Sequence, residues 1–376
     1  MKVKLNRKEF VCALSKITQV CKKRGTFAAL ACCLFEAKDG MVTVSATDLE
    51  STISIDLYDV EVSEEGTRCI NTEMLNSTLR TLTAQEVIID SAKDSVVKIY
   101  TEDKSANLRI NAIDVSEYPE IKFERKGFEW QKVSAKELYE AISKVDAAIS
   151  NDTTRVEFTG AEMMWNNNGF QLVATDGRRL HVYESSEYKR GYSDSRTIIP
   201  HGALKIIGES LSDNINKEID GTIEIGLLGG GKLLCNMSGL RFSAVVISGM
   251  FPDFRAVIPS NSPICCVVNS GLLSDALRTV RTVKNKVMSM RMSFEDKIVL
   301  TSENELSGCE VYVPYVNVLD RRTVIALNMD YLSDALKACA CEEVRFELTD
   351  CDSPMIVRDE DENNKNLTCI IMPIQL

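Results

Sequence analysis

The sequence predicts an α+β protein made of three repeated two-layer domains. Three observations lead to this prediction. A chain of 376 residues is too long for one ordinary hydrophobic core. A short strand followed by a short helix recurs at regular distances along it. After each helix, alternating apolar and polar residues predict antiparallel strands, so that each unit offers one helix and one sheet face.

The first set of strand–helix units opens each domain. It comprises residues 1–20, 128–148 and 263–283, which read "MKVKLNRKEFVCALSKITQV", "FEWQKVSAKELYEAISKVDAA" and "PICCVVNSGLLSDALRTVRTV". Within each helix the apolar residues recur at three- and four-residue spacing, which predicts one buried face. Asn6, Ser134 and Ser270 stand between strand and helix and are predicted to be the N-caps.

The second set lies midway between the first and comprises residues 67–82, 196–211 and 323–339. Runs with turn signals follow these helices at 86–112, 222–247 and 343–374 and predict antiparallel hairpins. The six half-units pair into domains 1–124, 125–256 and 257–376. The boundaries lie at "YPEIKFERKGFEW" and "FPDFRAVIPSNSP", where proline and charge cluster.

The charge of the chain limits what it can bind. A formal net charge of −11 argues against affinity for nucleic acid over the whole surface but allows a locally basic face. Basic residues lie off the apolar stripe of every predicted helix. On any single helix, they are explained by a face that is exposed to solvent. Their recurrence on all six predicts a common basic surface. They are Lys16, Lys22, Lys23, Arg24, Arg80, Lys136, Lys144, Lys205, Arg278, Arg281, Lys284, Lys286 and Lys337.

Composition gives no sign of a membrane span, a metal or a cofactor. No apolar run approaches the ~18 residues of a membrane helix, and the first residues alternate like a strand rather than a signal peptide. The 13 cysteines are scattered without a C-x-x-C pair, and the chain has 2 histidines. We therefore expect free thiols, a cytoplasmic protein, and neither metal nor cofactor.

Three stretches could carry chemistry. "GLLGGGKL" (226–233) resembles a phosphate loop but has Leu233 in place of Ser or Thr and precedes a predicted strand, so a hairpin turn is favoured. "RDEDENN" (358–364) could bind a metal, although a solvated hairpin tip explains it better. "QLVATDGRRLHV" (171–182) predicts a turn with arginines beside it, which is a plain hairpin or part of a site.

Three motifs follow one another along the chain: "VATDGRRL" (173–180), "FPDFRAVIP" (251–259) and the terminal "MPIQL" (372–376), with "SATDLE" (45–50) before them. With these motifs the chain resembles the bacterial sliding clamp family, the β subunit of DNA polymerase III. The resemblance covers the whole chain. It implies a head-to-tail homodimeric ring of six domains, with short helices lining the hole and antiparallel sheets outside.

The resemblance implies a DNA sliding clamp, with no catalytic residues, that encircles double-stranded DNA without reading its sequence. Its partners would be the polymerase α subunit, the clamp loader and repair polymerases, bound through short linear peptides. The DNA-facing residues would be Lys16, Arg24, Arg80, Lys144, Lys205, Arg278, Asn328, Tyr331 and Lys337. The peptide cleft would comprise Phe158, Thr175, Gly177, Arg178, Arg179, Leu180, Pro252, Val257, Ile370, Met372, Pro373, Ile374 and Leu376. Leu108 and Ile110 would lie at the dimer interface.

The sequence departs from the family pattern at three places. "RGTFAAL" (24–30) lacks the prolines that are common there, and His201 and Gly202 stand where a basic pair is common. Gln375 replaces the usual arginine in the last five residues. Two alternatives stay open at this stage: a nucleotide-binding enzyme that uses residues 226–233, and a repeat scaffold that never encircles DNA.

Overall fold

The structure is a computed structural model. It describes residues 1–21, 27–91, 96–124, 126–166, 169–185, 195–216, 221–228, 231–259, 262, 264–283, 285–316, 323–361 and 366–375. The described α-helices are α1 Arg7–Val20, α2 Thr72–Thr81, α3 Ala135–Val145, α4 His201–Asn216, α5 Ser270–Val280 and α6 Met329–Ala338. All lie where the repeated pattern predicts them. Within the described residues, no helix is both long and apolar enough to cross a membrane.

Asparagine caps recur along the chain. In each case the side-chain oxygen accepts hydrogen bonds from amides of the first helical turn, which would otherwise lack partners. The capping residues are Asn6 of α1, Asn71 of α2, Asn269 of α5 and Asn328 of α6. The predicted cap Ser270 is therefore wrong by one residue, since Asn269 accepts from Leu272 and Ser270 is the first helical residue. Ser134 directly precedes α3.

Strands and short 3-10 helices complete the regular secondary structure of the described chain. The strands of residues 1–124 are β1 Lys2–Asn6, β2 Cys32–Lys38, β3 Met41–Thr47, β4 Ser51–Leu57, β5 Val60–Glu64, β6 Gly66–Asn71, β7 Glu86–Asp90, β8 Val96–Tyr100 and β9 Asn107–Asn111. Those of residues 125–256 are β10 Phe128–Ser134, β11 Gly160–Asn166, β12 Gly169–Thr175, β13 Arg179–Glu184, β14 Ser195–Pro200, β15 Thr222–Leu228, β16 Lys232–Met237 and β17 Leu240–Val245. The remaining strands are β18 Ile264–Asn269, β19 Ser289–Phe294, β20 Ile298–Glu303, β21 Gly308–Val313, β22 Tyr315–Val316, β23 Thr323–Asn328, β24 Glu343–Leu348, β25 Met355–Asp359 and β26 Leu367–Ile371. The 3-10 helices are η1 Ala28–Ala31, η2 Val115–Glu117, η3 Asp146–Ala148, η4 Val156–Phe158 and η5 Phe254–Val257.

The described strands form antiparallel sheets with the orders β5-β1-β7-β8-β9, β10-β15-β16-β17-β4-β3-β2-β6, β14-β11-β12-β13-β26-β25-β24-β18-β22 and β21-β20-β19-β23. The predicted hairpins 86–112, 222–247 and 343–374 are confirmed as β7-β8-β9, β15-β16-β17 and β24-β25-β26. Strands β15 and β16 pair antiparallel on either side of the glycine-rich stretch 226–233, whose residues 229 and 230 lie outside the described residues. A strand rather than a helix follows this stretch, so the phosphate-loop alternative is wrong.

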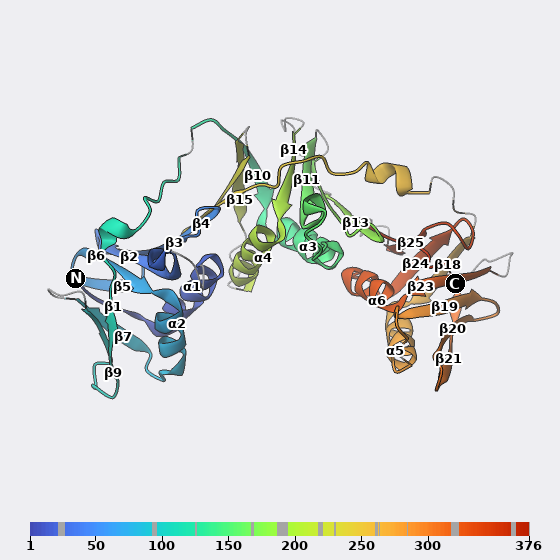
Figure 1. Cartoon of the computed structure of the whole chain (residues 1–376), viewed down its shortest axis with the longest axis horizontal. Coiled ribbons are helices and arrows are strands. Elements are labelled where there is room, and N and C mark those ends of the chain that lie inside the picture. Colours follow the sequence, from blue (N-terminus) through green and yellow to red (C-terminus); the bar gives the residue numbers. More distant parts are fainter. Residues whose placement is uncertain are drawn as a thin grey trace. The chain divides into compact units, whose positions relative to one another are not determined.

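The described chain forms two compact units, Met1–Lys136 with Lys205–Val246, and Glu137–Leu204 with Ile247–Leu376. Each unit contains one sheet that crosses a predicted domain boundary. In the first, β17 pairs with β4, and in the second, β13 pairs with β26. Helices α1 and α2 lie side by side in the first unit, and α5 and α6 do so in the second (Figure 1).

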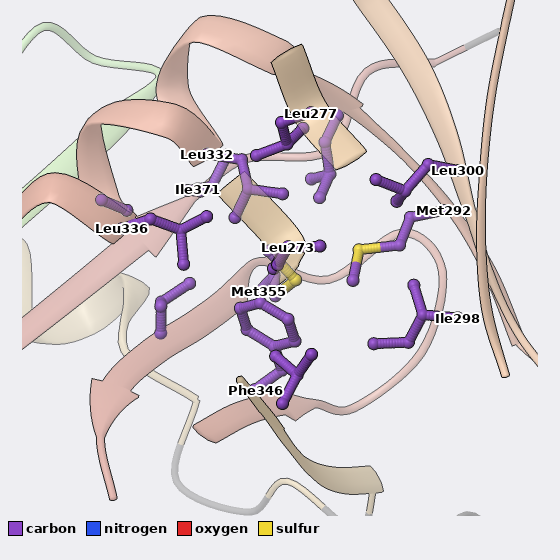
Figure 2. Close-up of a cluster of buried hydrophobic side chains, with 14 of the residues drawn as sticks. Leu273, Leu277, Met292, Ile298, Leu300, Leu332, Leu336, Phe346, Met355 and Ile371 are labelled. Carbon is purple, nitrogen blue, oxygen red and sulfur yellow. The ribbon is translucent and has the colours of Figure 1, made fainter. Parts of the chain in front are cut away.

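The apolar faces of these helices form the cores. In the second unit, Leu273 and Leu277 of α5 and Leu332 and Leu336 of α6 point toward sheet residues such as Phe346 (Figure 2). All five side chains are buried. Burying a leucine contributes about 1.5–3 kcal/mol, so this packing fixes α6 against the sheet that holds β26.

Candidate functional site

The turn between β12 and β13 is held by its own side chains. Thr175 Oγ1 donates to the carbonyl of Arg179 (2.6 Å) and accepts from Gly177 N (3.0 Å). Asp176 Oδ1 accepts from the amides of Arg178 (2.8 Å) and Arg179 (3.0 Å). Gly177 has φ of 84°, a left-handed conformation that glycine adopts without strain. The predicted turn is therefore present and is held by hydrogen bonds from its own side chains.

A pocket of about 200 Å³ opens beside this turn. Its lining residues are Phe158, Thr175, Gly177, Arg178, Arg179, Leu180, Pro252, Asp253, Phe254, Val257, Ile370 and Met372. The structure thus brings together most of the residues assigned to the cleft. Pro373 and Ile374 are half-buried but do not line the pocket, and Leu376 lies outside the described residues.

Sequence reasoning missed two lining residues, Asp253 and Phe254. Phe254 is buried and packs with Phe158, Leu180 and Ile370. Asp253 caps η5 by accepting from Arg255 N at 3.3 Å. Both belong to "FPDFRAVIP", where an aspartate directly before a helical turn and a second aromatic residue were the available signals.

The pocket floor is apolar and closely packed. Leu180 and Ile370 are paired across β13 and β26, and the rings of Phe158 and Phe251 meet edge to face with centroids 6.2 Å apart. At the rim, Val257 is 44% exposed. Met372, also at the rim, is 38% exposed. A buried floor with exposed apolar residues at the rim is typical of a site that takes apolar side chains.

The C-terminal stretch is both a strand and a wall of the pocket. Residues up to Ile371 pair as β26 with β13 and β25. Beyond it, Met372 N donates to the carbonyl of Arg178 (2.9 Å), and Ile374 N donates to that of Ala326 (2.8 Å). The tail is therefore fixed to the turn on one side and to β23 on the other.

Charged groups around the pocket are mostly held by neighbours. Arg178 is exposed, whereas Arg179 is half-buried and forms ion pairs with Asp176 (3.1 Å) and Asp334 (2.7 Å). The Arg155 guanidinium lies 5.5 Å from the ring centroid of Phe158. Arg178 is thus the lining cation that faces solvent most openly.

Buried His181 lies beside Leu180 on β13. Its Nδ1 donates to the carbonyl of Lys144 at 2.8 Å, while no described residue bonds its buried Nε2. Burial, helped by the nearby Arg179 and opposed by the hydrogen bond to the Lys144 carbonyl, lowers the pKa of His181 to about 4. This imidazole is neutral at physiological pH.

The cations assigned to the DNA face are in different environments. Arg80 and Lys205 are exposed, and Arg80 donates to Ser15 Oγ (2.8 Å). Lys16 pairs with Asp213 (2.7 Å), so α1 and α4 lie together in the first unit. Arg278 pairs with Asp275 while remaining largely exposed. Arg24 lies outside the described residues.

Lys144 corrects the assignment. Its side chain is only 7% exposed, and its Nζ is 2.7 Å from Glu140 and 5.7 Å from the ring centroid of Tyr183. Burial of a lysine is tolerated where a carboxylate compensates the charge. The Lys144 ammonium is thus buried against Glu140 and Tyr183, which does not favour its assignment to an exposed basic face.

The other residues assigned to this face have structural partners as well. Asn328 caps α6, and its Nδ2 donates to the carbonyl of Val287 (3.3 Å). The ring centroid of Tyr331 lies 4.5 Å from the Arg179 guanidinium. Lys337 is 70% exposed and pairs with Asp334 (3.0 Å).

The two interface residues also differ from each other. Both lie on the edge strand β9 with one residue between them, so they share a face. Leu108 is half-buried. Ile110 is 3% exposed and belongs to the chain's own core. Charged substitution of Ile110 is therefore expected to unfold this sheet, and the pair is a poor choice for separating folding from association.

Comparison with known proteins identifies the family. Residues 1–122, 132–253 and 255–375 match the family models for the N-terminal, central and C-terminal domains of the DNA polymerase III beta subunit. Similar relatives are the beta sliding clamps of Rickettsia bellii, 26% identical over 394 residues, and Haemophilus influenzae, 24% identical over 386, each match covering 100% of both chains.

Solved structures share the fold. The DNA polymerase III beta subunit of Thermotoga maritima has a TM-score of 0.88 at 24% identity, covering 100% of this chain and 99% of that one. The sliding clamp of Bartonella birtlesii bound to griselimycin has a TM-score of 0.89 at 24% identity, covering 100% of both. With all three domains matched in order, the chain belongs to the bacterial sliding clamp family, the β subunit of DNA polymerase III.

Proposed function

We propose that copies of this chain join head to tail into a closed ring, through strand β9 of one copy and β21 of the next. The observation that carries this proposal is a pair of unmatched sheet edges. Strands β9, β17 and β26 are the last strands of the runs β7-β8-β9, β15-β16-β17 and β24-β25-β26, so they hold equivalent places in the three repeats. β17 pairs with β4 and β26 pairs with β13, each of which follows a turn. β21 follows the equivalent turn at Asn304 and, like β9, is an edge strand among the described residues.

The repeat also supplies a register for this contact. The isolated bridges Cys69–Ile113 and Ile198–Ile247 are equivalent in the first and second repeats. When the repeats are aligned on these bridges, Leu108 is equivalent to Phe242, which pairs with Ile53 of β4. The turns that begin at Asp48 and Asn304 are also equivalent, and aligning them makes Cys309 the equivalent of Ile53. Leu108 would therefore lie opposite Cys309 of the next copy, as Phe242 lies opposite Ile53. Phe242 and Ile53 are fully buried, whereas Leu108 and Cys309 are half-buried in the single chain. Closure would complete their burial.

Cross-linking tests this proposal. Paired residues in antiparallel strands have Cα atoms about 4.5–5.5 Å apart, within the range of a disulfide. Leu108→Cys, oxidised with diamide, is expected to link to the natural Cys309 and to run on a non-reducing gel as a closed dimer. Arg109→Cys, whose side chain points to the other face, and Leu108→Cys in a Cys309→Ser background are the controls. A monomer band for Leu108→Cys would refute the pairing, and a ladder of larger species would refute a ring of two.

We further propose that the ring encircles double-stranded DNA without sequence preference. The cations Lys16, Arg80, Lys205, Arg278 and Lys337 support this, with Arg24 added from the family resemblance. Nearby Glu209 and Asp213 on α4 would keep the phosphate contacts weak, which sliding requires. The role is that of a non-catalytic tether in the cytoplasm, where the chromosome lies.

Retention on DNA tests encirclement. After loading by a clamp loader, the protein is expected to co-elute with nicked circular plasmid and to be lost when the plasmid is linearised. Equal loss from both forms would contradict a topological hold. The Arg80→Glu, Lys337→Glu variant is expected to load less and to show a shallower salt dependence.

The pocket beside Leu180 is the proposed docking site for peptides of the polymerase α subunit, the clamp loader and repair polymerases. Its apolar floor, its partly exposed rim and the exposed cation of Arg178 support this. Because a related clamp was solved with griselimycin bound, that compound is a suitable probe. We expect it to bind this chain in calorimetry and to compete with a peptide from the organism's own polymerase. Absence of binding by both would refute the pocket's assignment.

A further inference from the structure

The turn that borders the pocket is anchored on α6, and the anchor is a single carboxylate. Arg179 lines the pocket, but its guanidinium is directed to other groups. Nε bonds Asp176, and NH1 bonds Asp334 of α6 at 2.7 Å. The guanidinium carbon also lies 4.5 Å from the ring centroid of Tyr331. Arg179 is therefore committed to α6 and is a poor polar anchor for a bound peptide.

Asp334 holds two cations at once. Its Oδ2 accepts from Arg179, and its Oδ1 accepts from Lys337 Nζ at 3.0 Å. The Asp334 side chain is 25% exposed, and that of Arg179 13%. Burial alone would raise the pKa of Asp334, but the hydrogen bonds from Arg179 and Lys337 together outweigh it and lower the pKa. The Arg179 bond is shielded from water and is the stronger constraint.

Lys337, in contrast to Arg179, is exposed to solvent. Its side chain is 70% exposed, and it belongs to the proposed DNA face. A phosphate that draws Lys337 away leaves the Asp334 carboxylate to Arg179 alone. The turn then gains a stronger hold on α6, because one negative charge is no longer shared between two cations.

We propose that Asp334 is a positioning residue for the peptide pocket, and that Lys337 makes pocket affinity depend on the charge state of the DNA-facing side of α6. This rests on the proposed peptide-binding function. Neutralising Lys337 tightens the turn and strengthens peptide binding. By thermodynamic reciprocity, a bound peptide favours the state in which Lys337 is free to contact phosphate.

A double-mutant cycle with griselimycin as the probe tests this inference. Asp334→Asn keeps the shape but loses the charge, and is expected to weaken binding about fivefold or more. Lys337→Met imitates a neutralised lysine and is expected to strengthen binding by about twofold. In the Asp334→Asn background, Lys337→Met should have no effect. A purely structural role of Asp334 would not produce this dependence on Lys337.

A matched control lies on α5. Asp275 and Arg278 form an ion pair with the same three-residue spacing, and both are exposed. Asp275→Asn is expected to leave affinity unchanged. Wild-type affinity in Asp334→Asn, or an equal effect of Lys337→Met in both backgrounds, would overturn the inference. Since Lys337 is on the surface, its variant answers even if Asp334→Asn does not fold. If the wild-type chain fails to bind the probe, the pocket's proposed function fails instead.

Discussion

The chain contains two junctions at which a sheet crosses a predicted domain boundary, β4 with β17 and β13 with β26. They share the same backbone hydrogen bonds and turns, called here the backbone frame, but differ in their side chains. At the first, the turn Thr47–Ser51 has the hydrogen bonds of the turn Thr175–Arg179 at the second. Thr47 Oγ1 donates to the carbonyl of Ser51 (3.0 Å), and Asp48 Oδ1 accepts from Ser51 N (2.6 Å). The linkers match too, through the bridges Cys69–Ile113 and Ile198–Ile247. The frame is therefore a property of the repeat.

The surfaces beneath the two linkers differ. Ser45 and Ser54, paired in the first junction, stand where Val173 and Val182 pair in the second. A hollow of about 540 Å³ with a partly polar lining lies beneath the first linker, whereas the valines are packed into an apolar cluster. The first linker is fixed instead by Tyr118, whose hydroxyl donates to Cys32 O (3.3 Å) and accepts from Thr47 N (3.2 Å). A few side chains decide which copy of the frame has an apolar pocket.

The largest expected difference between the junctions comes from Leu180. It is 4% exposed and packs into the second junction's core as well as lining the pocket. Leu180→Ala should lower the free energy of unfolding by about 2–5 kcal/mol, besides weakening griselimycin binding. Thr52→Ala, at the equivalent place, should cost about 1 kcal/mol by losing its bond to Thr47. Urea titration measures both. Equal costs would show that the second junction is not the apolar one.

A smaller difference is expected in pH dependence. His181 stands where the first junction has Ile53. Its folded pKa of about 4 lies below the ordinary value of 6.5. Between these values the unfolded chain takes up a proton that the folded chain refuses. The contribution of His181 to the free energy of unfolding is thus fully present above pH 6.5. It is lost as the pH is lowered, by about 2 kcal/mol between pH 7 and pH 5.

His181→Gln should show that much less pH dependence over the same range. Thermal unfolding at several pH values, compared between the wild type and this variant, is the measurement. The slopes rather than the absolute stabilities matter, because the substitution also changes the bond to the Lys144 carbonyl. Parallel curves would mean that His181 is already accessible to protons in the folded chain.

The smallest difference concerns the tips of the turns. Leu49 has φ of 78° where Gly177 has 84°. Gly177→Leu should cost about 1 kcal/mol, because the left-handed conformation strains a residue with Cβ. The Cβ atom itself would meet only an ordinary contact, 3.5 Å from the Phe158 ring. Leu49→Gly should change stability little, as relief of strain is offset by a more flexible unfolded chain. A melting temperature that rises in Gly177→Leu, or falls markedly in Leu49→Gly, would contradict this account.

Much of the fold could be predicted because its signals are local. Helix spacing, caps and hairpin turns are set by residues near one another in sequence, and the one error in a cap, Ser270 for Asn269, is a single position. Pairing of β4 with β17 could not be predicted, since nothing in either strand specifies a partner in another domain. The turn of the site was predicted from "TDG", but its anchor Asp334 lies 155 residues from Arg179.

Burial of charged and apolar residues was the least predictable feature. Lys144 has Glu140 four residues before it, which is also the signal of an exposed ion pair. Only its approach to Tyr183 distinguishes the buried case. Ile110 and Leu108 share a face of β9 and pair with the equally buried Val97 and Ile99 of β8, yet Ile110 is buried and Leu108 is half-buried. The sequence pattern of an edge strand therefore does not tell how deeply each of its apolar residues is covered.

The two sheets that cross domain boundaries limit how the chain can be divided. A fragment ending near residue 124 would bare β4, and one beginning near residue 257 would bare β26, each over five paired positions. Such edges recruit other strands, so isolated domains would tend to aggregate or exchange strands. Intact polypeptide, cut at neither linker, is the smallest piece suited to expression, and labels for spectroscopy are better introduced at single surface sites than by joining separately produced domains.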